Sequence, residues 1–332
     1  MNALALNNMK ILQASEEHIP AIVDLLRLSL GEGSTPKSEG FWRWKHIHNP
    51  FGASYVSIAV IDGTIVGVRS FVKWKFKAGE SELSAVRAVD TAVHPSYQRR
   101  GIFSAMNQFL LERCLAEGVN FVFNTPNKKS LAGNLKMGWE QIGRLPVTLS
   151  FPGILNSIRP RREDDLEIIE AAKFDWSKAS VKGLLIEHLS NAGEHCTTAV
   201  DAHFLQWRYS DVPIHKYYVA STESRGLTSL LVYRIRTVRR KLRELRIVFF
   251  ASQEGANLGP MKLLLDRVIL REKVFLVSMA EPNRRSLQCM PKPRFSRLQI
   301  GPIVVGRGLN SGIDFMDGFR GWAPTIGDLE LF

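Results

Sequence analysis

One stretch of the chain combines residue types and spacing suited to binding a phosphate group. Val89–Val93 has the pattern of a buried strand, and Ser104–Glu117 has the pattern of an amphipathic helix. The turn between them would direct backbone N–H groups at the helix N-terminus toward one point, beside Arg99 and Arg100. The helix dipole and both guanidinium groups favour an anion there, and Gly101 lets the backbone approach it closely. The segment therefore predicts a phosphate or pyrophosphate site.

The residues of this turn resemble the acyl-CoA-binding signature of the GNAT acyltransferase superfamily, Gln/Arg-x-x-Gly-x-Gly/Ala. Gln98 and Gly101 match its first and fourth positions, whereas Phe103 stands where the family has a small residue. A second family motif, Asn-x-x-Ala…Tyr-x-Lys-x-Gly-Phe, is matched in spacing by Asn127, Ser130, Lys136, Gly138 and Trp139. Two motifs in the family's order make residues 9–150 similar to a GNAT domain.

The resemblance implies that acetyl-CoA or another acyl-CoA is the cosubstrate and that no metal takes part. The coenzyme diphosphate is expected on the turn and the first helical residues, and the thioester and pantetheine arm along the strand before them. The implied coenzyme-binding residues are Ala92, Val93, Gln98, Arg99, Arg100, Gly101, Ile102, Phe103, Ser104, Asn127 and Ser130.

Direct acyl transfer to an amine needs a group that accepts the amine's proton and a donor for the oxyanion. Asp90 is the only carboxylate on the strand before the turn, so it is predicted to act as the base or to position the amine. An aspartate that only orders the strands is an equal alternative. The Val93 N–H is the expected oxyanion donor, and His94 is interpreted as a residue that merely precedes the proline. Asn134 stands where the family has its general-acid tyrosine, so water or another side chain would protonate the thiolate.

An aromatic segment near residue 45 corresponds to the wall of the acceptor site in the family. Trp42, His46 and His48 are the predicted substrate-binding residues, because aromatic and imidazole groups suit a sugar or a cationic amine. Trp44 is expected to pack in the core instead, because the second half of the chain has Trp207 at the corresponding place.

The elements around these residues predict an α/β fold with a mixed sheet. Helices are expected at 19–30, 41–45, 104–117 and 128–137, the last of them capped by Asn127. Strands are expected at 11–12, 55–61, 65–74, 83–93, 119–124 and 141–149. This order of helices and strands is that of a GNAT domain.

The second half of the chain repeats features of the first. Phe204–Arg208 is similar to Phe41–Lys45, and Pro282–Leu287 is similar to Pro126–Leu131, at nearly constant spacing. The repeat has no basic glycine turn, which indicates a duplicated lobe that has lost coenzyme binding. We therefore expect two tandem GNAT-like lobes, each a twisted mixed sheet flanked by helices. The expected domains are residues 9–150 and 165–332.

Composition limits the class of protein. The 332 residues are 45% hydrophobic, as in a globular protein with a full core, and the net charge of +12 suits an anionic ligand. No apolar run reaches the length that spans a bilayer, and Met1–Lys10 lacks a secretory pattern, so a cytoplasmic protein is expected. Cys114, Cys196 and Cys289 lack metal-ligand spacing and are interpreted as buried or idle thiols.

The predicted function is N-acyl transfer from acyl-CoA to a primary amine of a small acceptor, with an amino sugar as one candidate. The basic run Arg234–Arg246 is interpreted as an exposed hairpin, with an anionic acceptor as the alternative. Two other functions stay open: an aminoacyl-tRNA-dependent transferase of the peptidoglycan type, and a non-catalytic acyl-CoA sensor. The intact phosphate turn argues against a nucleic-acid partner, and the oligomeric state is left open.

Overall fold

The computed structural model describes residues 8–31, 35–152, 166–190, 193, 195–223, 227–238, 241–253, 258–280, 284–310, 318–319 and 321–330. These residues belong to two compact units, each assembled from discontinuous parts of the chain. The first unit lies within Met1–Lys75, Leu83–Gln141 and Val305–Phe315. The second lies within Phe76–Glu82, Ile142–Val304 and Met316–Phe332. The limits 9–150 and 165–332 thus describe the order along the chain, and as domain limits they stay a prediction.

The first sheet has the strand order β1-β2-β3-β4-β5-β15-β6, and β9 pairs with β3. Its strands are β1 (Lys10–Gln13), β2 (Tyr55–Ile61), β3 (Thr64–Ala78), β4 (Ser81–Val93), β5 (Phe121–Asn124), β6 (Glu140–Arg144), β9 (Thr197–Thr198) and β15 (Ile303–Gly308). β4 and β5 run parallel, whereas β1 with β2, β2 with β3, and β5 with β15 are antiparallel. The sheet is therefore mixed, as predicted.

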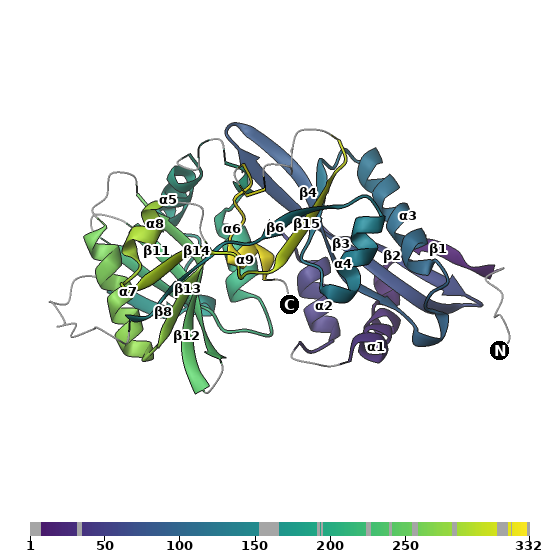
Figure 1. Cartoon of the computed structure of the whole chain (residues 1–332), viewed down its shortest axis with the longest axis horizontal. Helices are drawn as coiled ribbons and strands as arrows, with labels where there is room; N and C mark the ends of the chain where they lie inside the picture. The colour runs from purple at the N-terminus through teal and green to yellow at the C-terminus, as the bar shows by residue number, and fades with distance from the viewer. Residues whose placement is uncertain are drawn as a thin grey trace. The chain divides into compact units, whose positions relative to one another are not determined.

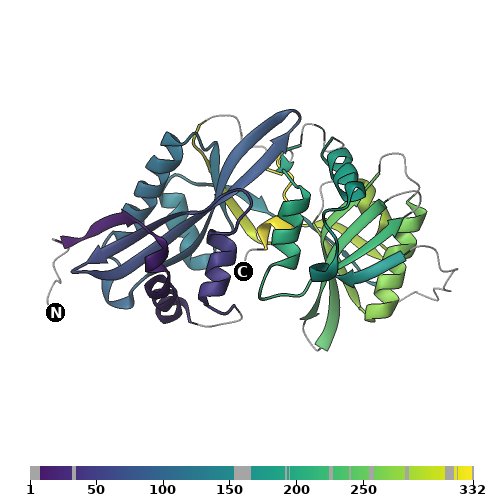
Figure 2. The same ribbon diagram turned by 180° about the vertical axis from the view of Figure 1, so that it is seen from behind.

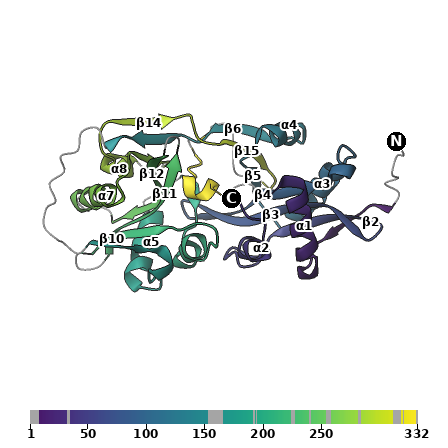
Figure 3. The ribbon, with the colours of Figure 1, turned by 90° about the horizontal axis from the view of Figure 1, so that it is seen from below.

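Helices cover both faces of this sheet. α1 (Ile19–Leu30) and α2 (Glu39–His46) lie on one face, and α3 (Ile102–Ala116) and α4 (Lys128–Lys136) lie on the other, as Figure 3 shows from below and Figure 2 from behind. The core under α1 includes Ile22, Leu26, Val56 and Ile58, and Ala92 of β4 belongs to it. The core under α3 contains Ala59, Ile61, Val66, Ile102 and Met106. Opposite faces of the same strands thus serve two helix layers, as the alternation of side chains in a strand requires.

Local sequence accounts for where these helices begin and how close they lie. The Ser38 hydroxyl accepts a hydrogen bond from the Phe41 N–H and so caps α2. α1 has Pro20 in its first turn and ends at Gly31, whose φ is 72°. Under α3, a Cβ on Gly67 would lie 3.0 Å from Ile102 and 3.1 Å from Met106, so only glycine lets the helix approach β3 this closely.

The second sheet has the order β14-β7-β13-β12-β11-β10-β8. Its strands are β7 (Val147–Ser150), β8 (Leu166–Glu170), β10 (Tyr218–Glu223), β11 (Leu227–Val238), β12 (Leu242–Ser252), β13 (Leu276–Met279) and β14 (Arg294–Leu298). Its helices are α5 (Ala179–Ser190), α6 (Ala202–Leu205), α7 (Gly259–Glu272), α8 (Arg284–Cys289) and α9 (Ile326–Leu329). β12 and β13 are the parallel pair, in the place that β4 and β5 hold in the first sheet. The matching orders confirm two similar lobes.

Each sheet contains one strand from the other half of the chain. β15 lies beside β5 in the first sheet, which Figure 1 shows as a yellow strand among blue ones, and β7 lies between β13 and β14 in the second. The prediction of a single last strand over residues 141–149 is therefore wrong. Pro146 interrupts it, because proline cannot donate to a ladder hydrogen bond, and the two pieces join different sheets as β6 and β7.

The structure supports the packing interpretation of the repeated aromatic segment. Phe41 and Trp44 stack with ring centroids 5.5 Å apart, and Phe204 and Trp207 pack at 5.8 Å. All four side chains are buried. Of the second repeated fragment, residues 281–283 lie outside the described residues, and α8 begins at Arg284 as α4 begins after Asn127.

The basic run forms the predicted hairpin, but its arginines are held by carboxylates. Arg234 and Arg246 both pair with Glu330, and Arg246 also pairs with Glu244. Arg243 pairs with Glu272 at 2.8 Å. Residues 239–240 lie outside the described residues. This face is therefore a set of ion pairs within the second lobe.

The three cysteines are free and buried, and burial raises the pKa of the Cys114 and Cys196 thiols to about 12. Across the described part of the chain, no helix is long and apolar enough to cross a bilayer.

Candidate active site

The predicted phosphate turn has the geometry of an anion site. α3 begins at Ile102, two residues earlier than predicted, and no side chain caps its N-terminus. The backbone before it is left-handed at Arg99 (φ 63°) and at Gly101 (φ 81°), which turns successive N–H groups inward. Arg99 is exposed and Arg100 is half-buried, with its guanidinium 5.6 Å from the centre of the Tyr97 ring. The first-turn N–H groups are thus presented at a helix N-terminus with two arginines beside them.

The strand that leads into the turn extends beyond its parallel neighbour. β4 pairs with β5 only from Ala85 to Arg87, and β5 ends at Asn124. The last residues of β4, with Ala92 and Val93, therefore run past the end of β5. A strand left uncovered on one side can offer its backbone to an extended ligand.

Other residues of the turn hold it in shape. The Gln98 side chain donates to the Val93 carbonyl at 3.1 Å, so in this structure Gln98 braces the turn. The His94 ring accepts from the Ser96 N–H at 3.2 Å, and Tyr97 packs against His94 with ring centroids 5.6 Å apart. The interpretation of His94 as a local turn residue agrees with this contact.

The second motif forms the start of α4. The Asn127 side chain accepts from the Ser130 N–H at 3.0 Å, so Asn127 caps the helix as predicted. The Ser130 hydroxyl also bonds to Asn127, at 3.2 Å. Asn134, in the place of the family's tyrosine, is 1% exposed, and neither atom of its side-chain amide has a hydrogen-bond partner among the described residues.

Asp90 lies at the centre of a buried cluster that the sequence did not predict. Its Oδ2 accepts from the Lys45 ammonium at 2.8 Å and lies 2.9 Å from Nε2 of His46. The side chains of Lys45, His46 and Asp90 are 1%, 0% and 12% exposed. Asp90 also has φ 41°, so a left-handed kink in β4 turns its side chain toward α2. Two adjacent residues of one helix thus hold one carboxylate of the sheet.

Electrostatics fix the protonation states of this cluster. Burial alone would raise the pKa of Asp90, but attraction to Lys45 and the hydrogen bond from His46 lower it well below its usual range. Burial lowers the pKa of His46 despite its contact with Asp90, so the ring is neutral at pH 7. Because a carboxylate only accepts, Nε2 of His46 carries the proton, and Nδ1 accepts from the Ser54 hydroxyl at 3.0 Å. Burial also lowers the pKa of Lys45, against the opposing attraction of Asp90.

A small pocket, with room for about one water molecule, lies beside this cluster on the α1–α2 side of the sheet. It is lined by Val23, Leu26, Lys37, Ser38, Phe41, Trp42, Lys45 and Asp90. Of the predicted substrate-binding residues, only Trp42 lines it. His46 lies behind Trp42 at a ring distance of 4.0 Å, and His48 is exposed beyond the end of α2.

Comparison with known proteins assigns the first lobe. Residues 10–142 match the family model described as an acetyltransferase (GNAT) domain. This part of the chain is a GNAT domain. A search of the curated proteins gave no match.

Solved structures extend the likeness in fold across both lobes. A probable N-acyltransferase from Enterococcus faecalis is 13% identical, with 91% of this chain and 73% of that one covered and a TM-score of 0.67. A GCN5-related N-acetyltransferase from Anabaena variabilis is also 13% identical, with 91% of this chain and 73% of that one covered and a TM-score of 0.66. A tandem GNAT protein from the clavulanic acid biosynthesis pathway is 15% identical, with 92% and 100% covered and a TM-score of 0.52.

Two residues of the GNAT domain, Lys45 and Arg69, were not predicted from the sequence as parts of the site. Lys45 stands between predicted aromatic positions, and only the fold shows that it faces Asp90. Arg69 of β3 is 2% exposed, and its guanidinium lies 4.6 Å from the centre of the Phe103 ring. A basic residue inside a strongly apolar strand was the available signal for Arg69, since such a charge needs a partner.

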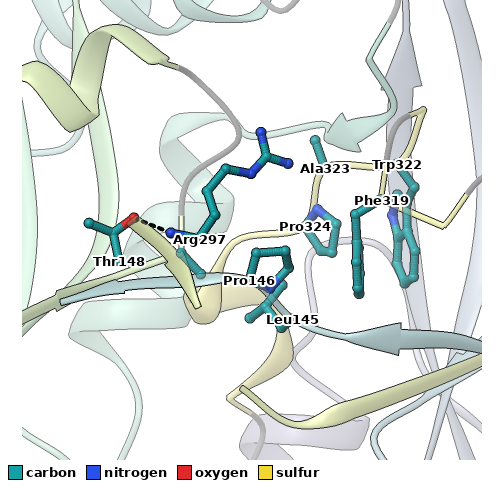
Figure 4. Close-up of a pocket in the computed structure, with 9 residues that line it drawn as sticks. Leu145, Pro146, Thr148, Arg297, Phe319, Trp322, Ala323 and Pro324 are labelled. Carbon is teal, nitrogen blue, oxygen red and sulfur yellow. Dashed lines mark hydrogen bonds between the residues drawn. The ribbon is translucent and has the colours of Figure 1, made fainter. Parts of the chain in front are cut away.

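The second lobe has a pocket of its own, shown in Figure 4. Leu145, Pro146, Phe319, Trp322 and Pro324 form apolar walls, and the Arg297 side chain extends along one side. The Thr148 hydroxyl accepts from the Arg297 N–H at 3.2 Å and so holds that backbone. None of the predicted site residues lies in this pocket.

Proposed function

We propose that the protein is an N-acyltransferase that moves an acetyl or other acyl group from acyl-CoA to a primary amine of a small acceptor. An amino sugar is one candidate acceptor. The observation that carries the proposal is the start of α3, a helix N-terminus with no side-chain cap, entered through left-handed Arg99 and Gly101 within a GNAT domain. An acyl-CoA substrate supports a cytoplasmic location.

In the proposed complex, the coenzyme diphosphate accepts hydrogen bonds from the N–H groups of Ile102, Phe103 and Ser104. Arg99 and Arg100 add charge-assisted contacts to the phosphate oxygens. The thioester arm lies along Ala92 and Val93, where β4 runs past the end of β5. Asn127 and Ser130, at the start of α4, complete the coenzyme side.

The acceptor places its ammonium group against Asp90, beside Trp42. Both contacts of Asp90 are made by Oδ2, so its Oδ1 can accept from the ammonium group of the acceptor. The lowered pKa makes Asp90 a weak proton acceptor, which favours amine positioning over base catalysis. Water then takes the ammonium proton, the neutral amine attacks the thioester carbonyl, and the Val93 N–H stabilises the oxyanion.

The leaving thiolate lies next to α4 in this arrangement. Asn134 has a buried amide with no partner among the described residues, and its Nδ2–H can donate to the sulfur. An amide has no proton to transfer, so Asn134 would stabilise the thiolate and water would protonate it.

The ion pairs of the second lobe weaken one alternative, the aminoacyl-tRNA-dependent transferase. Three of the arginines that favoured a tRNA partner, Arg234, Arg246 and Arg243, are paired with Glu330, Glu244 and Glu272. The non-catalytic sensor is distinguished from the enzyme by turnover alone.

The test is incubation with acetyl-CoA and a panel of primary amines while released thiol is measured. We expect thiol release that depends on the amine, and Arg100→Glu should weaken coenzyme binding at least tenfold. Arg271→Glu, a charge reversal of the same size at a half-exposed position of the second lobe, is the matched control and should bind normally. Binding without thiol release for any amine would identify a sensor, and equal binding by Arg100→Glu would contradict the assigned coenzyme site.

A further inference from the structure

Arg69 is a buried cation whose charge is not balanced by a carboxylate. It is 2% exposed, lies in β3 between Val68 and Ser70, and forms no ion pair among the described residues. Within the described part of the chain, its only hydrogen bond is from Nη1 to the Thr91 hydroxyl, at 3.1 Å. Burying a guanidinium in this way is costly, so its retention calls for an anionic partner.

The two nitrogens without partners lie on one edge of the guanidinium. Nε and Nη2 have no hydrogen-bond partner in the regions that the structure describes. These adjacent N–H groups form the fork that binds the two oxygens of a carboxylate. Both nitrogens of this edge are buried, and the aromatic contacts do not satisfy them. The rings of Phe103, at 4.6 Å, and Phe71, at 5.2 Å, contact the guanidinium carbon, whereas hydrogen bonds are made in the guanidinium plane.

The position of Arg69 places its guanidinium on the sheet face that carries the proposed coenzyme site. Phe103 is the second residue of α3, so the guanidinium lies on the sheet face that α3 covers. Asp90 and the acceptor pocket lie on the opposite face, toward α2. Thr91, which bonds to Arg69, is two residues before Val93, a spacing of roughly 7 Å along a strand. Arg69 is therefore attached to the last residues of β4, where the thioester is proposed to lie.

We propose that Arg69 recognises a carboxylate at the far end of the transferred acyl group, so that the donor is a dicarboxylic acyl-CoA of the succinyl class. This inference rests on the proposed function. In the reaction, the C–N bond of the amide forms and the thioester C–S bond breaks. One amine proton is transferred, through water, to the released thiol. The distal carboxylate stays ionised and unchanged against Arg69.

Phe103 has a defined part in this proposal. The family has a small residue at this place, whereas here a half-buried ring covers the guanidinium. The ring edge lies 3.8 Å from where a Cβ on Gly133 of α4 would be, so glycine leaves room beside it. Phe103 shields the ion pair from water, which strengthens it.

The test compares binding of CoA, butyryl-CoA and succinyl-CoA, because butyryl-CoA has the same chain length without the carboxylate. We expect the protein to bind succinyl-CoA at least tenfold more tightly than butyryl-CoA, since a bidentate charged pair is strong. Arg69→Met should abolish this preference and leave the affinity for CoA unchanged. Arg87→Met, which removes another buried arginine of the same sheet, is the control and should keep the preference.

Each other result overturns the inference. Equal binding of the two acyl-CoAs, or a preference that survives Arg69→Met, contradicts it. A preference for carboxylate-bearing amines that Arg69→Met removes would assign Arg69 to the acceptor instead. If Arg69→Met fails to fold, Arg69→Lys keeps the charge without the fork and should still reduce the preference. If CoA itself does not bind, the proposed function fails together with the inference about Arg69. If CoA binds but succinyl-CoA is not preferred, only the inference about Arg69 fails.

Discussion

Replacing Asp90 by asparagine is the sharpest test of the buried cluster. The substitution removes the carboxylate that balances Lys45, whose side chain is 1% exposed, and keeps nearly the same shape. It also replaces an acceptor of the His46 Nε2–H by an amide that can turn its oxygen to either partner. The main change is therefore the loss of one negative charge next to a buried ammonium group.

The size of the effect follows from burial. Removing one partner of a buried ion pair costs about 3–5 kcal/mol, because the other charge stays buried without compensation. In a protein of this size each kcal/mol lowers Tm by about 2–4 °C, so the expected loss is roughly 6–20 °C at pH 7. The double variant Lys45→Met with Asp90→Asn leaves no buried charge behind, and it should recover at least half of that loss.

The pH dependence has a definite sign. The pKa of Asp90 is lower in the folded protein than in the unfolded chain, so its contribution is present above about pH 4 and is lost as pH falls further. The pKa of His46 is also lowered, so below about pH 6.5 the unfolded chain takes up a proton that the folded protein refuses. Both effects destabilise the protein in acid. The difference between wild type and Asp90→Asn should shrink below pH 4.

Thermal unfolding followed by circular dichroism measures these values. Asp62→Asn is the matched control, because Asp62 also has a positive φ, of 49°, but is exposed in the β2–β3 turn. It should change stability by less than about 0.5 kcal/mol. If Asp90→Asn loses no more than Asp62→Asn, or if the double variant shows no recovery, the cluster does not hold α2 against β4 as described.

Three further predictions use other parts of the structure. Gly67→Ala should lower the free energy of unfolding, measured by urea denaturation, by about 1–3 kcal/mol, because its Cβ would crowd Ile102 and Met106. In the control, Gly183→Ala in α5, the new Cβ meets no atom within 4 Å and should not destabilise the protein. Asn134→Ala should lower kcat with little change in KM for acyl-CoA; an unchanged kcat would remove Asn134 from the reaction. A chain that ends at residue 152 lacks β15 and should show no cooperative unfolding transition, and a sharp transition would contradict the need for the exchanged strand.

Local signals allowed much of the site to be predicted. The strand, basic turn and helix of residues 89–117 follow from apolar spacing and from Gly101, and the structure places them as expected within two residues. The helix caps of Ser38 and Asn127, and the Asp62-Gly63 turn, depend on neighbouring residues only. Motif reasoning therefore located the strand, turn and helix of the first lobe on which the coenzyme is proposed to bind.

Tertiary pairings could not be predicted in the same way. Lys45 and His46 read as one polar stretch of an aromatic helix, and nothing in their spacing indicates that both face a carboxylate far along the chain. The left-handed φ of Asp90, which turns its side chain toward α2, is also invisible in a strand pattern. The sequence could suggest Asp90 as a base, but only the fold shows that Lys45 keeps it ionised.

The exchanged strands explain why the linear division of the chain and the compact units differ. Residues 140–150 carry one continuous β pattern, and Pro146 allows the chain to leave the first sheet after β6 and enter the second as β7. The place beside β5 is then filled by β15, whose Val305–Gly308 pair antiparallel with Phe121–Asn124. β5 is also the parallel neighbour of β4, the strand that leads into the phosphate turn. β15, from the C-terminal half of the chain, thus pairs with the strand that lies beside β4 and supports the end of β4 at the proposed coenzyme site.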